Sequence, residues 1–281
     1  MAKRLYHWSS DVCSSDLTYH RRIQEGRGQG TLAEYKPWLT VHDFPSKGRV
    51  SRTPGRTTNR PHHFFSKYET AYFYILDFSD IVLDIQEQYP LLPVTETTQL
   101  AERLQIRHPR DTVSKYPYVL TSDFVITTSK GTCVRSVKPS EKLADKRTRE
   151  KLELERRCWK DRGITDWKIV TEKQIDFEKS RNIEWVYRSW YYSEMLPECC
   201  RPEEVEDCFL HLYHTTIRPV VEIARRTEEN FGLRSGMGIT TYQHLLLKKR
   251  ITVDMSYPPD LQSVRIESRK GGANTWLPIY A

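Results

Sequence analysis

The sequence has no long apolar run. Nowhere in its 281 residues do apolar side chains extend over the roughly 20 positions that a membrane-spanning helix needs. The N-terminus also lacks the apolar core of a secretory signal peptide. The six cysteines form no CxxC pair and no spaced framework, which argues against a disulfide-stapled scaffold. We therefore expect a cytoplasmic protein with no membrane partner, whose cysteines remain thiols.

The length and the net charge of the chain indicate how many domains it has and what kind of partner it binds. A chain of 281 residues is long enough for two ordinary domains, each with its own core. Its formal charge of +7 suits a polyanionic partner, and nucleic acid is the favoured one. We expect a first domain at residues 18–175 and a second at residues 176–281.

The first 17 residues are set apart. Within them, "WSSDVCSSDL" (residues 8–17) shows no apolar periodicity and resembles the translation of a sequencing adapter. Residues 1–17 are interpreted as a non-native or disordered leader without function, and Cys13 is given no role. A genuine polar arm is the alternative.

The sequence of residues 18–175 predicts a domain with an α/β fold. Residues 18–60 are basic and rich in turn formers, which is typical of a loop-rich arm. Then follow a helix in "FFSKYETAYFYILDFSD", with Ser66 as N-cap and Glu69 three residues later, and a strand in "IVLDIQEQYPLLP". After a polar connection at residues 95–117, strands at 118–128 and 133–140 form a hairpin. A helix at 143–163 ending near Gly163 and a strand at 167–175 complete a mixed sheet flanked by helices.

The hairpin brings polar side chains together. If its turn centres between Ser129 and Lys130, Asp123 faces Ser136, and Lys138 lies on the diagonal of the same face. With Glu69, this pair could hold a divalent metal and a water beside a phosphodiester. Two plainer readings stay open, because Glu69 could serve only as a capping residue and Asp123 with Lys138 could be a surface ion pair.

Several segments between Arg21 and Tyr187 carry a family resemblance. In this order they resemble the TnsA-like endonuclease subunits of Tn-seven-type heteromeric transposases: "RRIQEGRGQG", "PWLTV", "HHFFSKYETA", "VLDIQEQYPLLP", "TSDFV", "VKP", "EKLELERRCW" and "NIEWVY". The resemblance implies a restriction-endonuclease-like catalytic domain, which agrees with the order of elements predicted above.

The resemblance also implies an active site. It places the catalytic residues at Glu69, Asp123 and Lys138, with Mg²⁺, or Mn²⁺ in its place, held by Glu69, Asp123 and the position of Ser136. That last position departs from the family, which has glutamine two residues before the lysine. Glu155 is a second acidic candidate, although a glutamate in so charged a helix is more often on a solvated face.

The activity implied is hydrolysis of the 5′ strands of double-stranded DNA at transposon ends. The implied partners are a DDE-type transposase subunit and an AAA+ ATPase regulator, in a bacterial cytoplasm and on the nucleoid when assembled. An alternative is a catalytically impaired DNA-binding or scaffold subunit, for which Ser136 is the hint in the sequence.

Basic residues near the start of the first domain are candidates for DNA contact. They are Arg21, Arg22, Arg27 and Arg49, which could bind phosphates or belong to a disordered arm that binds nothing specific.

The C-terminal domain is predicted to be mainly helical and winged-helix-like. "GITTYQHLLLKKRITVDMSYPPD" is typical of a helix, capped by Thr240 or Thr241, that runs into a strand. Lys248, Lys249 and Arg250 could touch phosphate or an acidic partner.

A cysteine and histidine group precedes that helix, formed by Cys199, Cys200, Cys208, His211 and His214. Cys208 and His211 are one helical turn apart, but no CxxC pair exists. Buried thiols and ordinary helix histidines are favoured over zinc ligands.

Overall fold

The computed structural model describes residues 14–43 and 50–263. The chain divides into two compact units, and the boundary falls between Ile175 and Asp176. No helix in the described ranges is long and apolar enough to cross a membrane.

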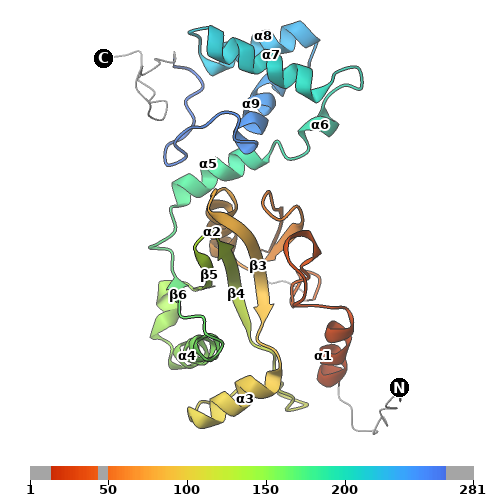
Figure 1. Cartoon of the computed structure of the whole chain (residues 1–281). Coiled ribbons are helices and arrows are strands. Elements are labelled where there is room, and N and C mark those ends of the chain that lie inside the picture. The colour runs from red at the N-terminus through yellow and green to blue at the C-terminus, as the bar shows by residue number, and fades with distance from the viewer. Residues whose placement is uncertain (1–13, 44–49, 264–281) are drawn as a thin grey trace. The chain divides into compact units, whose positions relative to one another are not determined.

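The N-terminal unit is built on a four-stranded sheet (Figure 1). The strands lie in the order β3 (Val82–Pro90), β4 (Thr121–Thr128), β5 (Gly131–Val137) and β6 (Trp167–Val170). The first three are antiparallel, and β6 runs parallel to β5, so the sheet is mixed as predicted. The hairpin has the predicted register, because Thr128 pairs with Gly131 and Phe124 with Arg135.

Helices cover both faces of this sheet. On one face, Phe124 packs against Phe64 and against Tyr72 of α2 (Lys67–Asp77). Successive side chains of a strand point to opposite faces. Val125 accordingly lies in a cluster with residues of α3 (Val94–Arg103) and α4 (Lys146–Asp161). The predicted arrangement of a mixed sheet flanked by helices is confirmed.

Some elements differ from those expected. The arm predicted at residues 18–60 has regular structure in and around it: helix α1 (Ser14–Gln24), a short 3-10 helix (Leu32–Glu34) and a hairpin of β1 (Ser51–Pro54) with β2 (Pro61–Phe64), which directly follows the arm. Residues 14–17, which were predicted to belong to the leader, lie in α1, and the non-native origin of residues 1–17 stays a prediction; residues 1–13 and Arg49 lie outside the described residues. The polar connection contains α3, whose Leu100 and Ala101 join the core.

The glycine-rich stretch of the arm lies close to the end of β3. Gly28 has a φ of 81°, and a Cβ there would lie 2.3 Å from the ring of Pro90. The backbone N–H of Trp38 donates to the carbonyl of Gln88. Gly28 therefore allows the arm to pack closely against the end of β3.

A buried charge cluster ties the β1–β2 hairpin to β3. Glu87 is fully buried and accepts hydrogen bonds from the Arg60 guanidinium at 2.9 and 2.6 Å and from His62 Nδ1 at 2.7 Å. Burial opposes its charge, but His62 and Arg60 hold the pKa of Glu87 far below its ordinary value. This cluster fixes the segment that leads directly into α2.

The C-terminal unit is helical throughout its described part. Its helices are α5 (Phe177–Tyr187), α6 (Tyr192–Met195), α7 (Pro202–Thr215), α8 (Val220–Phe231) and α9 (Met237–Leu247). Tyr192, Phe209, Tyr213 and Tyr242 are its largest fully buried side chains.

The prediction of a mainly helical C-terminal unit is confirmed, but one element of the expected winged-helix-like pattern is absent from its described part. No strand lies between residues 176 and 263, so the strand expected after α9 is wrong. Nor is α9 capped by Thr240 or Thr241. It begins after Gly236, where the Glu228 carboxylate accepts the N–H groups of Gly236 and Gly238 and satisfies donors that a helix N-terminus leaves open.

Replacing Glu87→Gln should destabilise the N-terminal unit. Removing one partner of a buried ion pair costs about 3–5 kcal/mol, because Arg60 is left buried without its counter-charge. Urea unfolding at neutral pH measures the loss. Since the folded pKa of Glu87 is depressed, this stabilisation is present above the ordinary carboxyl pKa and is lost in acid, so the difference should shrink there.

The matched control is Glu102→Gln, at an exposed position of α3. It should change the free energy of unfolding by no more than about 0.5 kcal/mol. Equal stability of the Glu87→Gln variant and the wild type would contradict the role given to the cluster.

Candidate active site

The sheet divides at one point, and the polar residues gather there. Pairing of β4 with β5 ends at Phe124 and Arg135. Beyond it, β5 continues with β6 as far as Val137, whereas β4 continues with β3 as far as Thr121. The two central strands therefore part at Asp123, and side chains fill the space between them.

Asp123 bridges the parting strands. Its Oδ2 accepts the backbone N–H of Val137 at 2.7 Å and the Lys138 ammonium at 2.6 Å. The residue is only 8% exposed. The convergence of Asp123 and Lys138 that the hairpin register indicates is thus present, and the pair is not a loose surface contact.

Lys138 lies directly after β5. Its backbone N–H donates to the carbonyl of Val170 in β6, which fixes where the side chain starts. Burial disfavours its charge, but Asp123, Glu155 and Glu69 outweigh that effect and raise the pKa of Lys138 above its ordinary value. The ammonium stays protonated at neutral pH.

Glu69 caps a helix, and its carboxyl group is also influenced by Asp123. It receives the hydroxyl of Ser66 at 2.7 Å and the N–H of Phe65 at 3.1 Å, while its own N–H donates to the Ser66 side chain, so it is a capping residue of α2. Burial and the charge of Asp123 raise the pKa of Glu69 to about 7. Its carboxyl group therefore lies within electrostatic reach of Asp123.

Gln88 connects Glu69 to the far side of the site. Its Nε2 lies 3.5 Å from Glu69 Oε2, and its Oε1 accepts the hydroxyl of Thr121 at 3.2 Å. Gln88 has a φ of 50°, a backbone conformation that is uncommon for residues other than glycine and asparagine. Backbone strain of this kind often accompanies functional positions.

The solvated-face interpretation of Glu155 is wrong. The residue is 7% exposed, and its carboxyl group accepts hydrogen bonds from Ser122 at 2.7 Å, Ser136 at 2.6 Å and Trp167 Nε1 at 3.1 Å. Burial and then Asp123 raise the pKa of Glu155. It lies on the inner face of α4, one side of which lines the site.

Ser136 is fully buried, and its hydroxyl lies 2.6 and 2.7 Å from the two carboxyl oxygens of Glu155. Its side chain therefore supports Glu155 directly. A role of Ser136 as a metal ligand stays a prediction.

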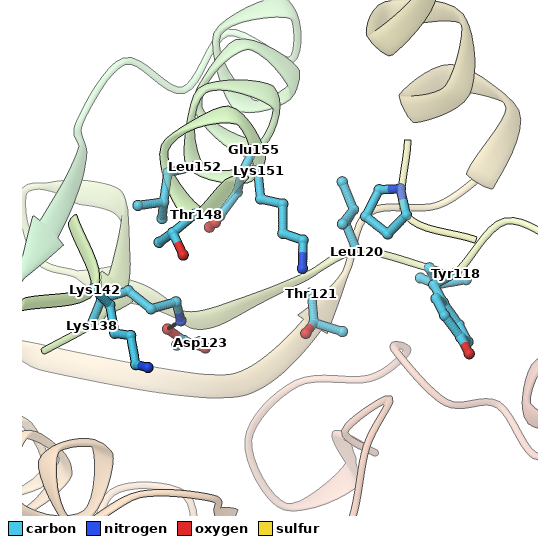
Figure 2. Close-up of a pocket in the computed structure, with 12 residues that line it drawn as sticks. Tyr118, Leu120, Thr121, Asp123, Lys138, Lys142, Thr148, Lys151, Leu152 and Glu155 are labelled. Atoms are coloured by element: carbon cyan, nitrogen blue, oxygen red, sulfur yellow. Dashed lines mark hydrogen bonds and ion pairs between the residues drawn. The ribbon is translucent and has the colours of Figure 1, made fainter. Parts of the chain in front are cut away.

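A cavity of about 400 Å³ opens beside Asp123. Figure 2 shows Asp123 and Lys138 on its floor, with Lys142, Thr148, Lys151 and Glu155 around them. Sequence reasoning missed Lys142, Lys151 and the hydrogen-bonding Ser122. The available signal was spacing, since Lys151 lies one helical turn before Glu155 and Ser122 precedes Asp123.

The donors of this site suit a hard divalent cation. Among residues 14–43 and 50–263, no three Asp, Glu, His or Cys side chains are grouped tightly enough to form an all-protein cage. Mg²⁺ is usually bound by one or two carboxylates, with waters and substrate phosphates completing the shell. Asp123 and Glu69 could supply the carboxylates, and burial followed by the negative charge of Asp123 raises the pKa of Glu69.

The arginines of the arm are mainly structural. Arg27 contacts Asp43 at 2.6 Å and Arg22 contacts it at 3.5 Å, and both arginine side chains are largely buried. Arg21 is exposed and lies 3.6 Å from Glu25. Of these three, only Arg21 presents its guanidinium to solvent.

In the C-terminal unit, Lys248 Nζ lies 2.9 Å from the buried carboxyl group of Glu206, which also receives Arg250 at 3.0 Å. Lys248 therefore balances an internal charge. Lys249 lies just past α9 with a φ of 58°. Whether either lysine contacts DNA stays a prediction.

The cysteine and histidine group shows no metal-binding arrangement among the described residues. Cys208 Sγ accepts a hydrogen bond from Asn230, Cys199 and Cys200 are adjacent thiols, and His211 and His214 are exposed on α7.

Comparison with known proteins follows the same division of the chain. Residues 79–172 match the family model of the TnsA-like endonuclease N terminal domain, and residues 174–255 match that of the TnsA endonuclease C terminal domain. Asp123, Ser136, Lys138 and Glu155 lie inside the first match, and Glu69 precedes it.

A curated relative carries the same assignment. The chain is 44% identical over 176 residues to the transposon Tn7 transposition protein TnsA of Escherichia coli. The aligned part covers 62% of this chain and 63% of that protein. TnsA-like N-terminal domains have a restriction-endonuclease-like fold, which the mixed sheet between helices matches. Two consecutive family domains and this identity show that the chain belongs to the TnsA-like family.

Proposed function

We propose that this protein is a magnesium-dependent DNA endonuclease that cuts the 5′ strands at transposon ends during cut-and-paste transposition. The observation that carries the proposal is the Asp123–Lys138 pair at the parting of β4 and β5, with Glu69 in electrostatic reach. A protonated lysine beside buried carboxylates, in a cavity open to solvent, suits hydrolysis of a phosphodiester.

Each residue has a distinct task in the proposed reaction. Asp123 and Glu69 would hold the divalent cation, which supplies Lewis-acid stabilisation of charge on the phosphate. Lys138, kept protonated by Asp123, would orient the attacking water or offset negative charge that develops on the scissile phosphate. The N–H of Val137 holds Asp123 Oδ2 in place, which leaves Oδ1 as the oxygen available to a cation.

Glu155 and Ser136 would act together. Ser136 and Ser122 hold the Glu155 carboxyl group beside Asp123, so Glu155 could accept a hydrogen bond from a water of the cation's shell. Serine is thereby accommodated at a position where the family pattern has glutamine. This hydrogen bonding favours the enzyme over the catalytically impaired scaffold.

The partners proposed are double-stranded DNA at transposon ends, a DDE-type transposase subunit and an AAA+ ATPase regulator. They are inferred from the family, whose named relative is a transposition protein. The proposed location is the bacterial cytoplasm, on the nucleoid when the complex is assembled.

The Asp123→Asn and Lys138→Ala variants should each reduce nicking of supercoiled donor DNA by about a hundredfold or more. Asp123→Asn removes charge for the cation, and Lys138→Ala removes the ammonium at the phosphate. The assay contains the partner subunits with Mg²⁺ or Mn²⁺ and scores cutting of the 5′ strand.

Lys130→Ala is the matched control, because Lys130 is exposed in the turn of the same hairpin. It should nick like wild type. If Asp123→Asn and Lys138→Ala also nick like wild type, the assigned site is wrong. If the wild type itself does not nick while the complex still assembles, the protein is a scaffold subunit.

Nicking should fall as the pH decreases through about 7 at limiting Mg²⁺. Burial and Asp123 raise the pKa of Glu69, so below that pH its carboxyl group takes up a proton and loses affinity for a cation. Higher Mg²⁺ competes with the proton and should move the midpoint to lower pH. Calorimetric titration of Mg²⁺ across the same pH range supplies a readout that does not depend on cutting.

The Glu69→Gln variant is the control for this assignment. It should bind Mg²⁺ more weakly than wild type, and the step near pH 7 should be absent from its binding profile. A wild-type binding profile without a step between pH 6 and 8, the range around the raised pKa, would contradict the role of Glu69.

A further inference from the structure

Two lysines beside the proposed catalytic residues have no partner of their own. Lys142 and Lys151 line the cavity next to Asp123 and Lys138. In Figure 2 the side chain of Lys142 extends toward Asp123, and that of Lys151 extends toward Thr121. Among the described residues, neither ammonium group has an ion pair or a hydrogen bond.

The lack of a partner for Lys151 has a structural cause. Glu155 lies four residues later on α4, the spacing at which opposite charges normally pair across one helical turn. The Glu155 carboxyl group instead turns inward to Ser136 and Trp167. Elsewhere on the same helix, Lys146 does lie near its counterpart at this spacing, Glu150.

Lys142 is held in place by its neighbours in the chain. It lies in the short 3-10 helix Ser140–Ala144, which begins directly after Lys138 and Pro139. The side chain of Glu172 accepts both the backbone N–H and the hydroxyl of Ser140. This anchor fixes the segment that carries Lys142, so the lysine is presented from an ordered backbone.

The cavity therefore carries more positive charge than its acidic lining balances locally. Asp123 is matched by Lys138, and Glu155 is satisfied by neutral donors. The ammonium groups of Lys142, just before α4, and of Lys151, on α4, remain without a counter-charge in a space large enough to admit an anionic group. Lysine binds phosphate as a compact point charge on a flexible stem.

We propose that Lys142 and Lys151 bind backbone phosphates next to the scissile phosphate, so that the DNA strand leaves the active site along the α4 side of the cavity. The inference rests on the proposed function, because it takes the strand being cut as the ligand. The inference adds the direction in which the DNA strand runs past the active site and names two lysines that position that DNA strand. Neither lysine takes part in the chemical step.

The test is the salt dependence of DNA binding by the full chain, measured by fluorescence anisotropy with a short labelled duplex and chelator present to prevent cutting. Each phosphate contact contributes about 0.9 to the slope of log affinity against log salt concentration. The Lys142→Ala/Lys151→Ala double variant should therefore lose about 1.8 from that slope. Duplexes with and without a transposon-end sequence should be affected equally.

Two control variants distinguish the loss of positive charge at the cavity from the loss of positive charge elsewhere on the protein. Lys160→Ala removes an exposed lysine of the same helix that does not line the cavity, and its slope should match wild type. The Lys142→Arg/Lys151→Arg double variant keeps both charges and should restore most of the slope. A slope for the Ala double variant equal to that of wild type, or a loss no larger than that of Lys160→Ala, would overturn the proposal.

Nicking by the wild type is scored in parallel, so that the phosphate contacts and the nuclease activity can be rejected independently of each other. Active nicking with an unchanged slope would reject only the phosphate contacts. Absent nicking with the expected loss of slope would reject the nuclease and retain DNA binding at this cavity. Failure of the wild-type chain to bind the duplex even at low salt would reject the contacts.

Discussion

The hydrogen bond from the Val137 N–H to Asp123 Oδ2 is the interaction on which the site depends. In a continuous sheet that N–H would face a backbone carbonyl of β4, but here pairing has ended at Phe124 and Arg135. A carboxylate takes the place of the carbonyl, so the backbone donor is satisfied while the strands separate. The same oxygen receives Lys138, and one side chain thus both opens the sheet and organises its charge.

The second carboxylate reaches the site by a different structural route. Glu69 is on α2, whose N-terminus directly follows β2, and β2 is fixed to β3 by the bonds of Arg60 and His62 to Glu87. Charge buried in the core thereby determines where a helix begins. The capping bonds from Ser66 and Phe65 then set the direction of the Glu69 side chain. Stability of the core and geometry of the site are coupled through this segment.

The sequence predicted the parts of the site that depend on local regularity. The turn between Ser129 and Lys130 predicted the register of the hairpin and with it the approach of Asp123 to Lys138, but not that cross-strand pairing ends at Phe124 and Arg135, so that Asp123 does not pair with Ser136. The capping pattern likewise located Glu69. Glu155 was misjudged, because its burial depends on Ser122, Ser136 and Trp167 from three separate strands. The β1–β2 hairpin was missed for the same reason, since its Arg60 and His62 are held by the buried Glu87, which lies on β3 and is distant in the sequence.

The remaining charge of the site explains why a cation and an anion can both be accommodated there. The carboxyl groups of Asp123 and Glu69 lie near one lysine, and burial followed by the charge of Asp123 raises the pKa of Glu69. Lys142 and Lys151 have no acidic partner among the described residues, and for Lys151 the cause is that Glu155, four residues later on α4, has turned to neutral donors. The proposed cation would therefore be held by the carboxyl groups of Asp123 and Glu69, and the proposed phosphate contacts would be made by the two lysines that lack a counter-charge in the same cavity.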